Sequence, residues 1–272
     1  MRELTDIKQI QDVLQGTLSY FADFCKKNEL TFFLSNGSML GAVKYQQFIP
    51  WDDDVDILMP RADYDKLIAL ADISSGPYRL LCRETVPGWR VPFAKLSDTR
   101  TLLKEGEFKF GTELGISLDI FPLDKWHPNL RTARWQARFQ NILVRMMFGA
   151  NAPHFKTNKR GVRKFILGCI WVAGHIIGSQ RLCRWLERRT RRWSKYPDGH
   201  LGCVIWNCYG EKEVLPAEVF AKAQTIRFCG DDYPVPVGYD TYLTSLYGAW
   251  REELPPERQK SNHIIRAWRK DE

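Results

Sequence analysis

Four aspartates fall within five positions of the sequence, Asp52–Asp54 and Asp56. Carboxylates at this density repel one another and resist burial unless a positive charge joins them. The neighbouring segments Phe48–Trp51 and Ile57–Met59 are nevertheless apolar, which is unusual for a solvated acidic loop. The simplest explanation is a divalent metal ion held at the mouth of a strand, with a phosphate group nearby.

Two of these aspartates have the spacing of paired metal ligands. Val55, Ile57 and Met59 alternate with Asp54, Asp56 and Leu58, which predicts a strand. Because side chains two positions apart on a strand share a face, Asp54 and Asp56 lie close enough to hold one ion. Residues 115–122 predict a second strand, in which alternating apolar residues face the core and Asp119 lies on the opposite face. Asp119 is therefore the candidate for a third carboxylate.

Asp54, Asp56 and Asp119 together offer only oxygen ligands, which hard cations such as Mg²⁺ and Mn²⁺ prefer. In phosphoryl-type transfer, such a metal neutralises the charge that develops on phosphate oxygens. The third carboxylate can bind a second metal ion or accept the proton of the attacking hydroxyl. We therefore predict that these three residues are metal ligands and catalytic residues. An EF-hand calcium loop is excluded, because counting from Asp52 or Asp54 gives neither the required Gly at position six nor Glu at position twelve.

A small-residue turn, Asn36-Gly37-Ser38, precedes the aspartates. Glycine lets the backbone approach a phosphate closely, and free N–H groups with a serine hydroxyl can bind it. We predict that Gly37 and Ser38 contact a phosphate, in a turn between a strand over residues 30–34 and a helix that starts at Met39.

The elements that must position these residues indicate an α+β fold. Helical spacing of apolar residues predicts helices over residues 3–27, 61–71, 131–148, 165–178, 181–193, 216–223 and 239–247. Strands are predicted over residues 30–34, 54–59, 78–82, 91–96, 101–103, 115–122 and 201–206, with a hairpin over 225–236. We expect a mixed-sheet catalytic core over residues 1–128, a basic helical insertion over 129–198, and a C-terminal part over 199–272 that packs on the core.

Positive charge is concentrated in the predicted insertion. The net charge is +8, and between Arg131 and Arg192 there is no Asp and a single Glu, Glu187. One side of the helix over residues 131–148 is predicted to hold Trp135, Phe139, Ile142, Leu143, Met146 and Met147. Basic helices with Trp on their apolar side are typical of proteins at a lipid headgroup surface. We predict contact with an anionic membrane surface rather than with nucleic acid; a helical insertion whose charge only keeps it soluble is the alternative.

The chain begins with a polar amphipathic segment, so no signal peptide is predicted. The apolar segment 165–178 contains three glycines and is too short to span a membrane, which takes about 20 residues. Seven cysteines without a CxxC pair indicate reduced thiols. Cys203, Cys208 and His200 could bind zinc, but their spacing matches no standard finger. We expect a cytoplasmic protein that is peripheral on the inner face of the membrane.

The motifs, in their order, resemble the LicD family, choline-phosphate transferases related to the fukutins within the nucleotidyltransferase-fold superfamily. The resemblance covers nearly the whole chain, and its most specific part is Gly37–Val43 followed by Phe48–Ile57. Further matching segments are Met59–Arg61, Asp63-Tyr64, Phe93–Leu96 with Asp98, Asp119–Asp124, Tyr209-Gly210, Lys212-Glu213, Tyr239-Asp240, Tyr242-Leu243, Tyr247-Gly248 and His263. Ala249 departs from the pattern, which has an acidic residue there, and this leaves the acceptor open.

The resemblance implies a nucleotidyltransferase-like mixed-sheet core that transfers a phosphocholine-type group from a CDP-activated donor, CDP-choline first. The acceptor would be a hydroxyl of a cell-surface glycan, such as a teichoic acid or a lipopolysaccharide, or of its lipid-linked precursor. Asp54 and Asp56 inherit the metal role, and Asp119 the role of ligand or base. The implied substrate contacts are Gly37, Ser38 and Lys95 for phosphate, Asp53 for the metal ligands or the donor head, and His263.

A choline head carries a quaternary ammonium group, which donates no hydrogen bonds and is held by cation–π contacts. Trp51 is the candidate that we place in the site, with Tyr45 and Trp89 as further candidates. A donor that carries ribitol phosphate, glycerol phosphate or aminoethylphosphonate is an alternative within the same enzyme class. The alternative from another class is a non-catalytic protein that binds a membrane surface through its basic helices, with a purely structural acidic cluster.

Overall fold

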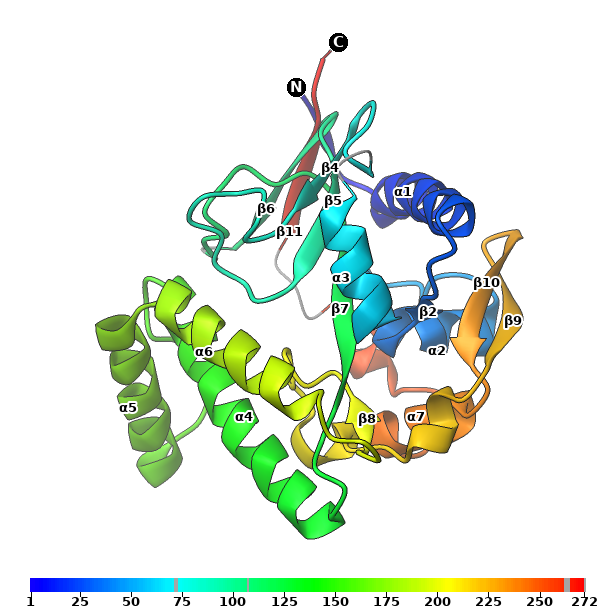
Figure 1. Cartoon of the computed structure of the whole chain (residues 1–272). Helices are drawn as coiled ribbons and strands as arrows, with labels where there is room; N and C mark the ends of the chain where they lie inside the picture. The colour runs from blue at the N-terminus through cyan, green and yellow to red at the C-terminus, as the bar shows by residue number, and fades with distance from the viewer. Residues whose placement is uncertain (71–72, 107, 262–264, 272) are drawn as a thin grey trace.

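The computed structural model describes residues 1–70, 73–106, 108–261 and 265–271 (Figure 1). Its helices and strands are, in chain order, β1 (Arg2–Leu4), α1 (Ile7–Lys27), β2 (Phe33–Leu34), α2 (Asn36–Tyr45), β3 (Val55–Pro60), α3 (Arg61–Ala69), β4 (Tyr78–Leu81), β5 (Ala94–Asp98), β6 (Thr101–Glu105), β7 (Ser117–Lys125), α4 (Leu130–Asn151), α5 (Gly161–Ile177), α6 (Ser179–Trp193), β8 (Leu201–Gly202), β9 (Ala223–Phe228), β10 (Asp231–Pro236), α7 (Tyr239–Tyr247) and β11 (Ile265–Arg269).

The main sheet has the strand order β2-β3-β7-β5-β4, with β8 paired to the far end of β7. β3 and β7 run parallel, whereas the other pairs are antiparallel. β7 is the longest strand and lies at the centre, with nearly every residue buried. Helix α1 packs its apolar side, which includes Leu14, Leu18 and Phe21, against this sheet. The sheet and its helices confirm the predicted α+β class.

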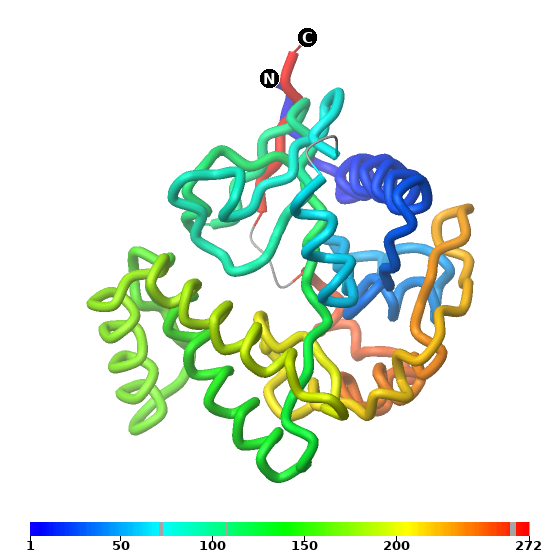
Figure 2. Tube along the Cα trace, in the orientation of Figure 1, coloured from blue at the N-terminus to red at the C-terminus, as the bar shows by residue number. Residues whose placement is uncertain are grey.

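A second sheet joins the two ends of the described chain. β1 pairs with β11, and β11 pairs with β6, so the order is β1-β11-β6. The two termini therefore lie side by side, as the tube in Figure 2 shows. The predicted hairpin is confirmed as β9 and β10, which pack beside β2 and α2.

Helices α4, α5 and α6 form a separate layer below the second sheet in Figure 1, with α5 outermost. Their shared core holds Leu143, Val144, Met147, Leu182 and Leu186. The side of α4 that was predicted to be apolar is only partly buried. Leu143 and Met147 are buried, whereas Trp135, Phe139 and Ile142 are exposed. The buried side instead contains Gln136, whose Oε1 accepts a hydrogen bond from the backbone of His127 at 3.0 Å.

Four predicted elements or boundaries are also wrong. Residues 36–38 are not a turn, because α2 already begins at Asn36, which takes the left-handed conformation (φ 45°) that Asn tolerates. Pro122 does not end β7. It lies between the stretch of β7 that pairs with β5, up to Ile120, and the stretch that pairs with β8, from Asp124, so its missing N–H is tolerated. The strand over 201–206 shrinks to β8, and the helix over 216–223 is a 3-10 turn at Ala217–Phe220.

Among the described residues, no single helix has the length and apolar character needed to cross a membrane. Only α5 and α6 taken together meet that test, and they are bent by 95° relative to each other. The division into parts at residues 128 and 198 stays a prediction.

Candidate active site

A cavity of about 460 Å³ opens at the amino ends of β3 and β7. Most of the predicted site residues line it, namely Gly37, Trp51, Asp53, Asp54, Asp56, Lys95 and Asp119. Asp52 lines it as well. His263 lies outside the described residues. The cavity therefore brings together segments from three separate regions of the chain.

Three charged residues form a row across the sheet. Asp56 on β3 is the register partner of Asp119 on β7, and Asp119 is the register partner of Lys95 on β5. Side chains of register partners project from the same face of a sheet. Lys95 Nζ donates a hydrogen bond to Asp119 Oδ1. Lys95 is buried, so it is not an ordinary surface lysine.

The amino end of α2 fixes the backbone of Asp56. Ser35 N donates to Asp56 O, and Asp56 N donates to Ser38 Oγ, each at 2.9 Å. Ser38 is buried and does not line the cavity. Asn36 accepts a hydrogen bond from the Tyr242 hydroxyl at 2.9 Å and also bonds the carboxyl of Asp56. The Ser38 hydroxyl therefore positions Asp56 in this structure, and its predicted phosphate contact stays a prediction.

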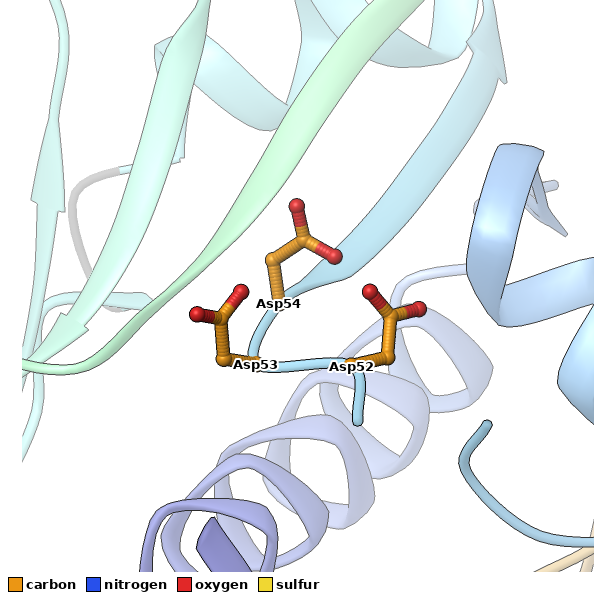
Figure 3. A group of neighbouring side chains, drawn as sticks. All are labelled: Asp52, Asp53 and Asp54. Atoms are coloured by element: carbon orange, nitrogen blue, oxygen red, sulfur yellow. The ribbon is translucent and has the colours of Figure 1, made fainter. Parts of the chain in front are cut away.

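Asp52, Asp53 and Asp54 direct their carboxylates to the same side of the segment that leads into β3 (Figure 3). One carboxylate oxygen from each lies within 4.8 Å of the others. Within the described part of the chain, this is the one group of three or more His, Cys, Asp or Glu residues that meets this spacing. The sequence predicted that Asp56 and Asp119 would join Asp54 as metal ligands. In the structure, Asp52 also lies beside Asp54. The set Asp54, Asp56 and Asp119 stays a prediction.

Close backbone approach and polar contacts hold this acidic segment in place. A Cβ atom at Gly37 would lie only 2.6 Å from Asp52 Oδ2, so the glycine is required for the carboxylate to reach the first turn of α2. Gln11 Nε2 donates to Asp52 O at 2.9 Å. Ser261 Oγ donates to Asp53 Oδ2 at 2.8 Å, which brings the C-terminal segment to the site.

The electrostatics of the cavity are those of a cation site. Burial raises the pKa of Asp56 well above its ordinary value, and the nearby carboxylates of Asp54 and Asp119 raise it further. Burial opposes the charge of Lys95, but Asp119 and Glu105 outweigh it and raise the pKa of that ammonium group. An all-oxygen set of carboxylates suits Mg²⁺ or Mn²⁺, and a bound cation would relieve the repulsion at Asp56.

The structure adds cavity residues for which the sequence predicted no role. Glu213 is buried, and its Oε1 accepts a hydrogen bond from Tyr209 N at 2.9 Å. Burial raises the pKa of Glu213 to about 8. Tyr209 and Tyr247 line the same cavity and their hydroxyls lie 3.2 Å apart. Glu213 and both tyrosines belong to segments that carry the family resemblance. No local sequence pattern, however, indicates that these segments approach Asp56.

Of the three aromatic residues considered for a quaternary ammonium group, Trp51 lines the cavity and is half-buried. Trp89 is buried, and its indole N–H donates to Phe93 O at 2.9 Å. The Tyr45 hydroxyl donates to Glu253 Oε2 at 3.2 Å. The structure therefore brings only Trp51 of these three to the aspartates.

Comparison with known proteins agrees with this geometry. Residues 29–141 match the protein family described as LicD/FKTN/FKRP, nucleotidyltransferase domain. The chain is also 26% identical over 276 residues to the lipopolysaccharide cholinephosphotransferase LicD of Haemophilus influenzae, an alignment that covers 98% of this chain and 99% of that protein. The matched residues include β3, β5, β7 and every predicted site residue except His263. The resemblance inferred from the motifs is confirmed, and residues 29–141 match a LicD-family domain.

Proposed function

We propose that this protein is a metal-dependent transferase that moves a phosphocholine-type group from a CDP-activated donor to a hydroxyl of a cell-surface glycan or of its lipid-linked precursor. The observation that carries the proposal is the meeting of Asp52–Asp54, Asp56, Asp119 and Lys95 in one cavity. The relative from Haemophilus influenzae, by its name a lipopolysaccharide cholinephosphotransferase, supports the reaction class and a glycan acceptor.

The carboxylates would hold Mg²⁺ or Mn²⁺. Asp54, Asp56 and Asp119 are the proposed ligands, with Asp52 and Asp53 close by. When bound, the metal supplies positive charge to the donor's phosphate oxygens. Because a carboxylate must be deprotonated to bind a metal, Asp56 would have to be ionised when the site is occupied.

The remaining residues bind and orient the substrates. Asp119, held by Lys95, is placed to accept the proton of the acceptor hydroxyl as that oxygen attacks the donor phosphorus and CMP leaves. Lys95 lines the same cavity and is the proposed contact for a donor phosphate. Gly37 and Ser38 lie in the first turn of α2, where backbone N–H groups favour an anion. A substrate contact by His263 remains part of the proposal.

Aromatic residues in the cavity support a choline head. Trp51, Tyr209 and Tyr247 line the cavity together with the carboxylates, and a quaternary ammonium group is held by aromatic faces and negative charge. Ribitol phosphate, glycerol phosphate and aminoethylphosphonate carry no quaternary ammonium and would leave these aromatic faces unused. We therefore place CDP-choline first among the donors.

A donor screen tests this function directly. Purified protein with Mg²⁺ and no acceptor is incubated with CDP-choline, CDP-ribitol, CDP-glycerol or a cytidine-activated aminoethylphosphonate, and the release of CMP is measured. We expect slow release from CDP-choline that disappears in Asp54→Asn. If no donor releases CMP or raises the melting temperature in the presence of Mg²⁺ or Mn²⁺, the non-catalytic membrane-binding alternative gains.

The helical layer supports a peripheral position on the inner face of the membrane. Ten of the fourteen large apolar side chains exposed among the described residues lie between Leu130 and Trp185. Residues 131–192, which overlap this region, carry one acidic residue, Glu187, among many Arg and Lys residues. Exposed aromatic and aliphatic side chains beside cationic ones match a headgroup surface of anionic lipids.

A further inference from the structure

A second cavity, of about 790 Å³, adjoins the aspartate cavity. It lies between the end of β6, helix α4 and helix α5. Glu105, Phe148 and Cys208 line both cavities. A molecule that fills the second cavity therefore reaches the wall of the first, where the transfer is proposed to take place.

The wall of this second cavity is mostly apolar. Its main apolar side chains are Phe108, Val144, Phe148, Leu167, Ile170 and Trp171. Such a wall favours a hydrocarbon over a sugar or a nucleotide, because burying apolar surface removes it from water. The volume lies within the range of about 300–1,000 Å³ typical of small-ligand sites, enough for part of one chain rather than for several.

Basic side chains line the same cavity. Arg145 on α4, and His154 and Lys156 in the segment between α4 and α5, are among its wall residues. Arg145 is exposed, and its Nε donates to Asn141 Oδ1 at 2.7 Å. Guanidinium and ammonium groups beside an apolar wall suit a ligand in which a phosphate adjoins a hydrocarbon chain.

Helix α5 is rich in apolar residues, as expected for a helix that lines a hydrocarbon-binding cavity. From Phe165 to Ile177 it is apolar apart from His175, yet Gly174 is the one buried residue of the helix. A helix of this kind is normally enclosed by protein or lipid. Here Leu167 and Ile170 line the cavity, whereas Phe165 and Ile176 are exposed. The apolar residues on both sides of α5 are explained if one side contacts a bound hydrocarbon chain and the other side contacts a membrane.

Two glycines hold α5 against α4. A Cβ atom at Gly174 would lie 2.2 Å from Met146 O, and one at Gly149 would lie 3.1 Å from Trp171 Cα. Trp171 Nε1 donates to Ala152 O at 3.1 Å. These contacts anchor α5 to the last turns of α4 and so form one wall of the cavity.

We propose that this cavity binds the hydrocarbon chain and the adjoining phosphate of a lipid-linked acceptor. The glycan of the acceptor then extends past Phe148 and Cys208 toward Asp119. The inference rests on the proposed function, since it needs the transfer reaction to take place at the aspartates. It adds a lipid site formed by α4 and α5 to that function.

The test is a calorimetric titration of the full chain with farnesyl phosphate, without donor or metal. Leu167→Trp and Ile170→Trp fill the cavity, and Val162→Trp makes the same change at an exposed position of α5 that does not line it. Excluding about two methylene groups from the cavity corresponds to roughly tenfold weaker binding. We expect that loss in the two cavity variants and wild-type affinity in Val162→Trp. Equal affinity in all four proteins overturns the proposal.

Arg145→Gln, compared with Arg163→Gln on the exposed surface of α5, tests the phosphate contact separately and does not depend on core packing. We expect Arg145→Gln to weaken farnesyl phosphate binding several-fold and to leave farnesol binding unchanged. Sedimentation with phosphatidylglycerol vesicles distinguishes a bilayer lipid from an acceptor lipid. If Leu167→Trp loses vesicle binding and Val162→Trp keeps it, the cavity holds a bilayer lipid and the assignment to an acceptor falls.

Release of CMP from CDP-choline with Mg²⁺ is measured on the same samples. If the proposed function is wrong, the wild-type protein releases no CMP, while the lipid titration still reports on the cavity. If CMP is released and farnesyl phosphate does not bind, only the lipid site is wrong.

Discussion

Asp56 and Asp119 are register partners on two parallel strands, although they lie far apart in the chain. Their side chains project from the same face of the sheet into a cavity that also holds Asp54. Lys95, next in the row, hydrogen-bonds to Asp119 and not to Asp56. The repulsion among the carboxylates is therefore only partly relieved by the protein itself, and a bound cation would relieve more of it.

Replacing Asp56 by Asn should make the metal-free protein more stable but the enzyme less active. Burial and the neighbouring carboxylates raise the pKa of Asp56, and a carboxyl with a raised folded-state pKa makes the metal-free protein less stable as pH rises above the ordinary value. Asp56→Asn should therefore raise the melting temperature of the metal-free protein at pH 7.5. It should also lower CMP release by at least about 100-fold. A variant that is less stable without metal, or fully active, would contradict this interpretation.

The same shift predicts a pH dependence of metal binding. Protons compete with the metal for Asp56, so the affinity for Mn²⁺ should increase as pH rises from 5 to 8. Asp56→Asn should flatten this dependence, whereas Asp63→Asn, at a half-buried position of α3 outside the cavity, should not. Calorimetric titration with Mn²⁺ at several pH values measures it. An affinity that is independent of pH in the wild-type protein would exclude Asp56 as a ligand.

Gly37→Ala tests the contact between α2 and Asp52. The new methyl group would lie 2.6 Å from Asp52 Oδ2 and must displace that carboxylate. If Asp52 contributes to the cation site, Gly37→Ala should weaken Mn²⁺ binding by about tenfold, within the range for residues that orient metal ligands. In an Asp52→Ala background the same change should have little further effect, since the two residues act through one contact. Additive losses would show that Gly37 has a separate role, such as the predicted phosphate contact.

Ser38→Ala removes the acceptor of the hydrogen bond from Asp56 N. Because Ser38 is buried, the N–H loses its partner and unfolding free energy should fall by about 1–3 kcal/mol. CMP release should fall too, since Asp56 is no longer held at the start of β3. Ser194→Ala, near the end of α6, serves as the control, with a change of about 0.5 kcal/mol or less in urea unfolding. Unchanged activity in Ser38→Ala would show that Asp56 needs no support from α2.

The sequence predicted the parts of this site that depend on short spacing. The alternation of Asp54 and Asp56 with apolar residues sets their strand and their face. Asp119 is found in the same way, and β7 does carry it. The alignment of Asp119 with Lys95 depends on the register between β5 and β7, for which no local pattern exists. Glu213 is likewise brought to the cavity by tertiary packing alone.

The errors have local physical causes. The turn predicted at residues 36–38 is absent because α2 already begins at Asn36, a residue that tolerates the positive φ it adopts there. The side of α4 that holds its large apolar residues is only partly buried. Trp135 is exposed, whereas Gln136 is buried and hydrogen-bonds to His127. Counting apolar residues cannot show which polar side chain finds a partner inside the protein.

Glu213 should make stability depend on pH. Burial raises its folded-state pKa from the ordinary 4.5 to about 8. Below pH 4.5, Glu213 is protonated in both the folded and the unfolded protein. Between pH 4.5 and about 8, it loses its proton in the unfolded protein only, so the free energy of unfolding falls as pH rises. Glu213→Gln keeps an acceptor for Tyr209 N and should remove this fall, which amounts to roughly 4 kcal/mol at most by pH 8. Urea unfolding at pH 5 and pH 8 measures it. A similar loss between the two pH values in both proteins would show that Glu213 ionises normally.

An ion pair between Arg61 and Asp124 joins the start of α3 to the carboxyl end of β7. Arg61 Nε donates to Asp124 Oδ1 at 2.8 Å, and the Asp124 side chain is fully buried. Burial raises the pKa of Asp124 although Arg61 opposes the shift. Asp124→Ala would leave Arg61 largely buried without its main partner, and this should cost about 3–5 kcal/mol of unfolding free energy in urea. Asp65→Ala removes a half-exposed partner of the same arginine and should cost about 1 kcal/mol or less. Equal losses in the two variants would show that the buried pair contributes no more than a surface contact.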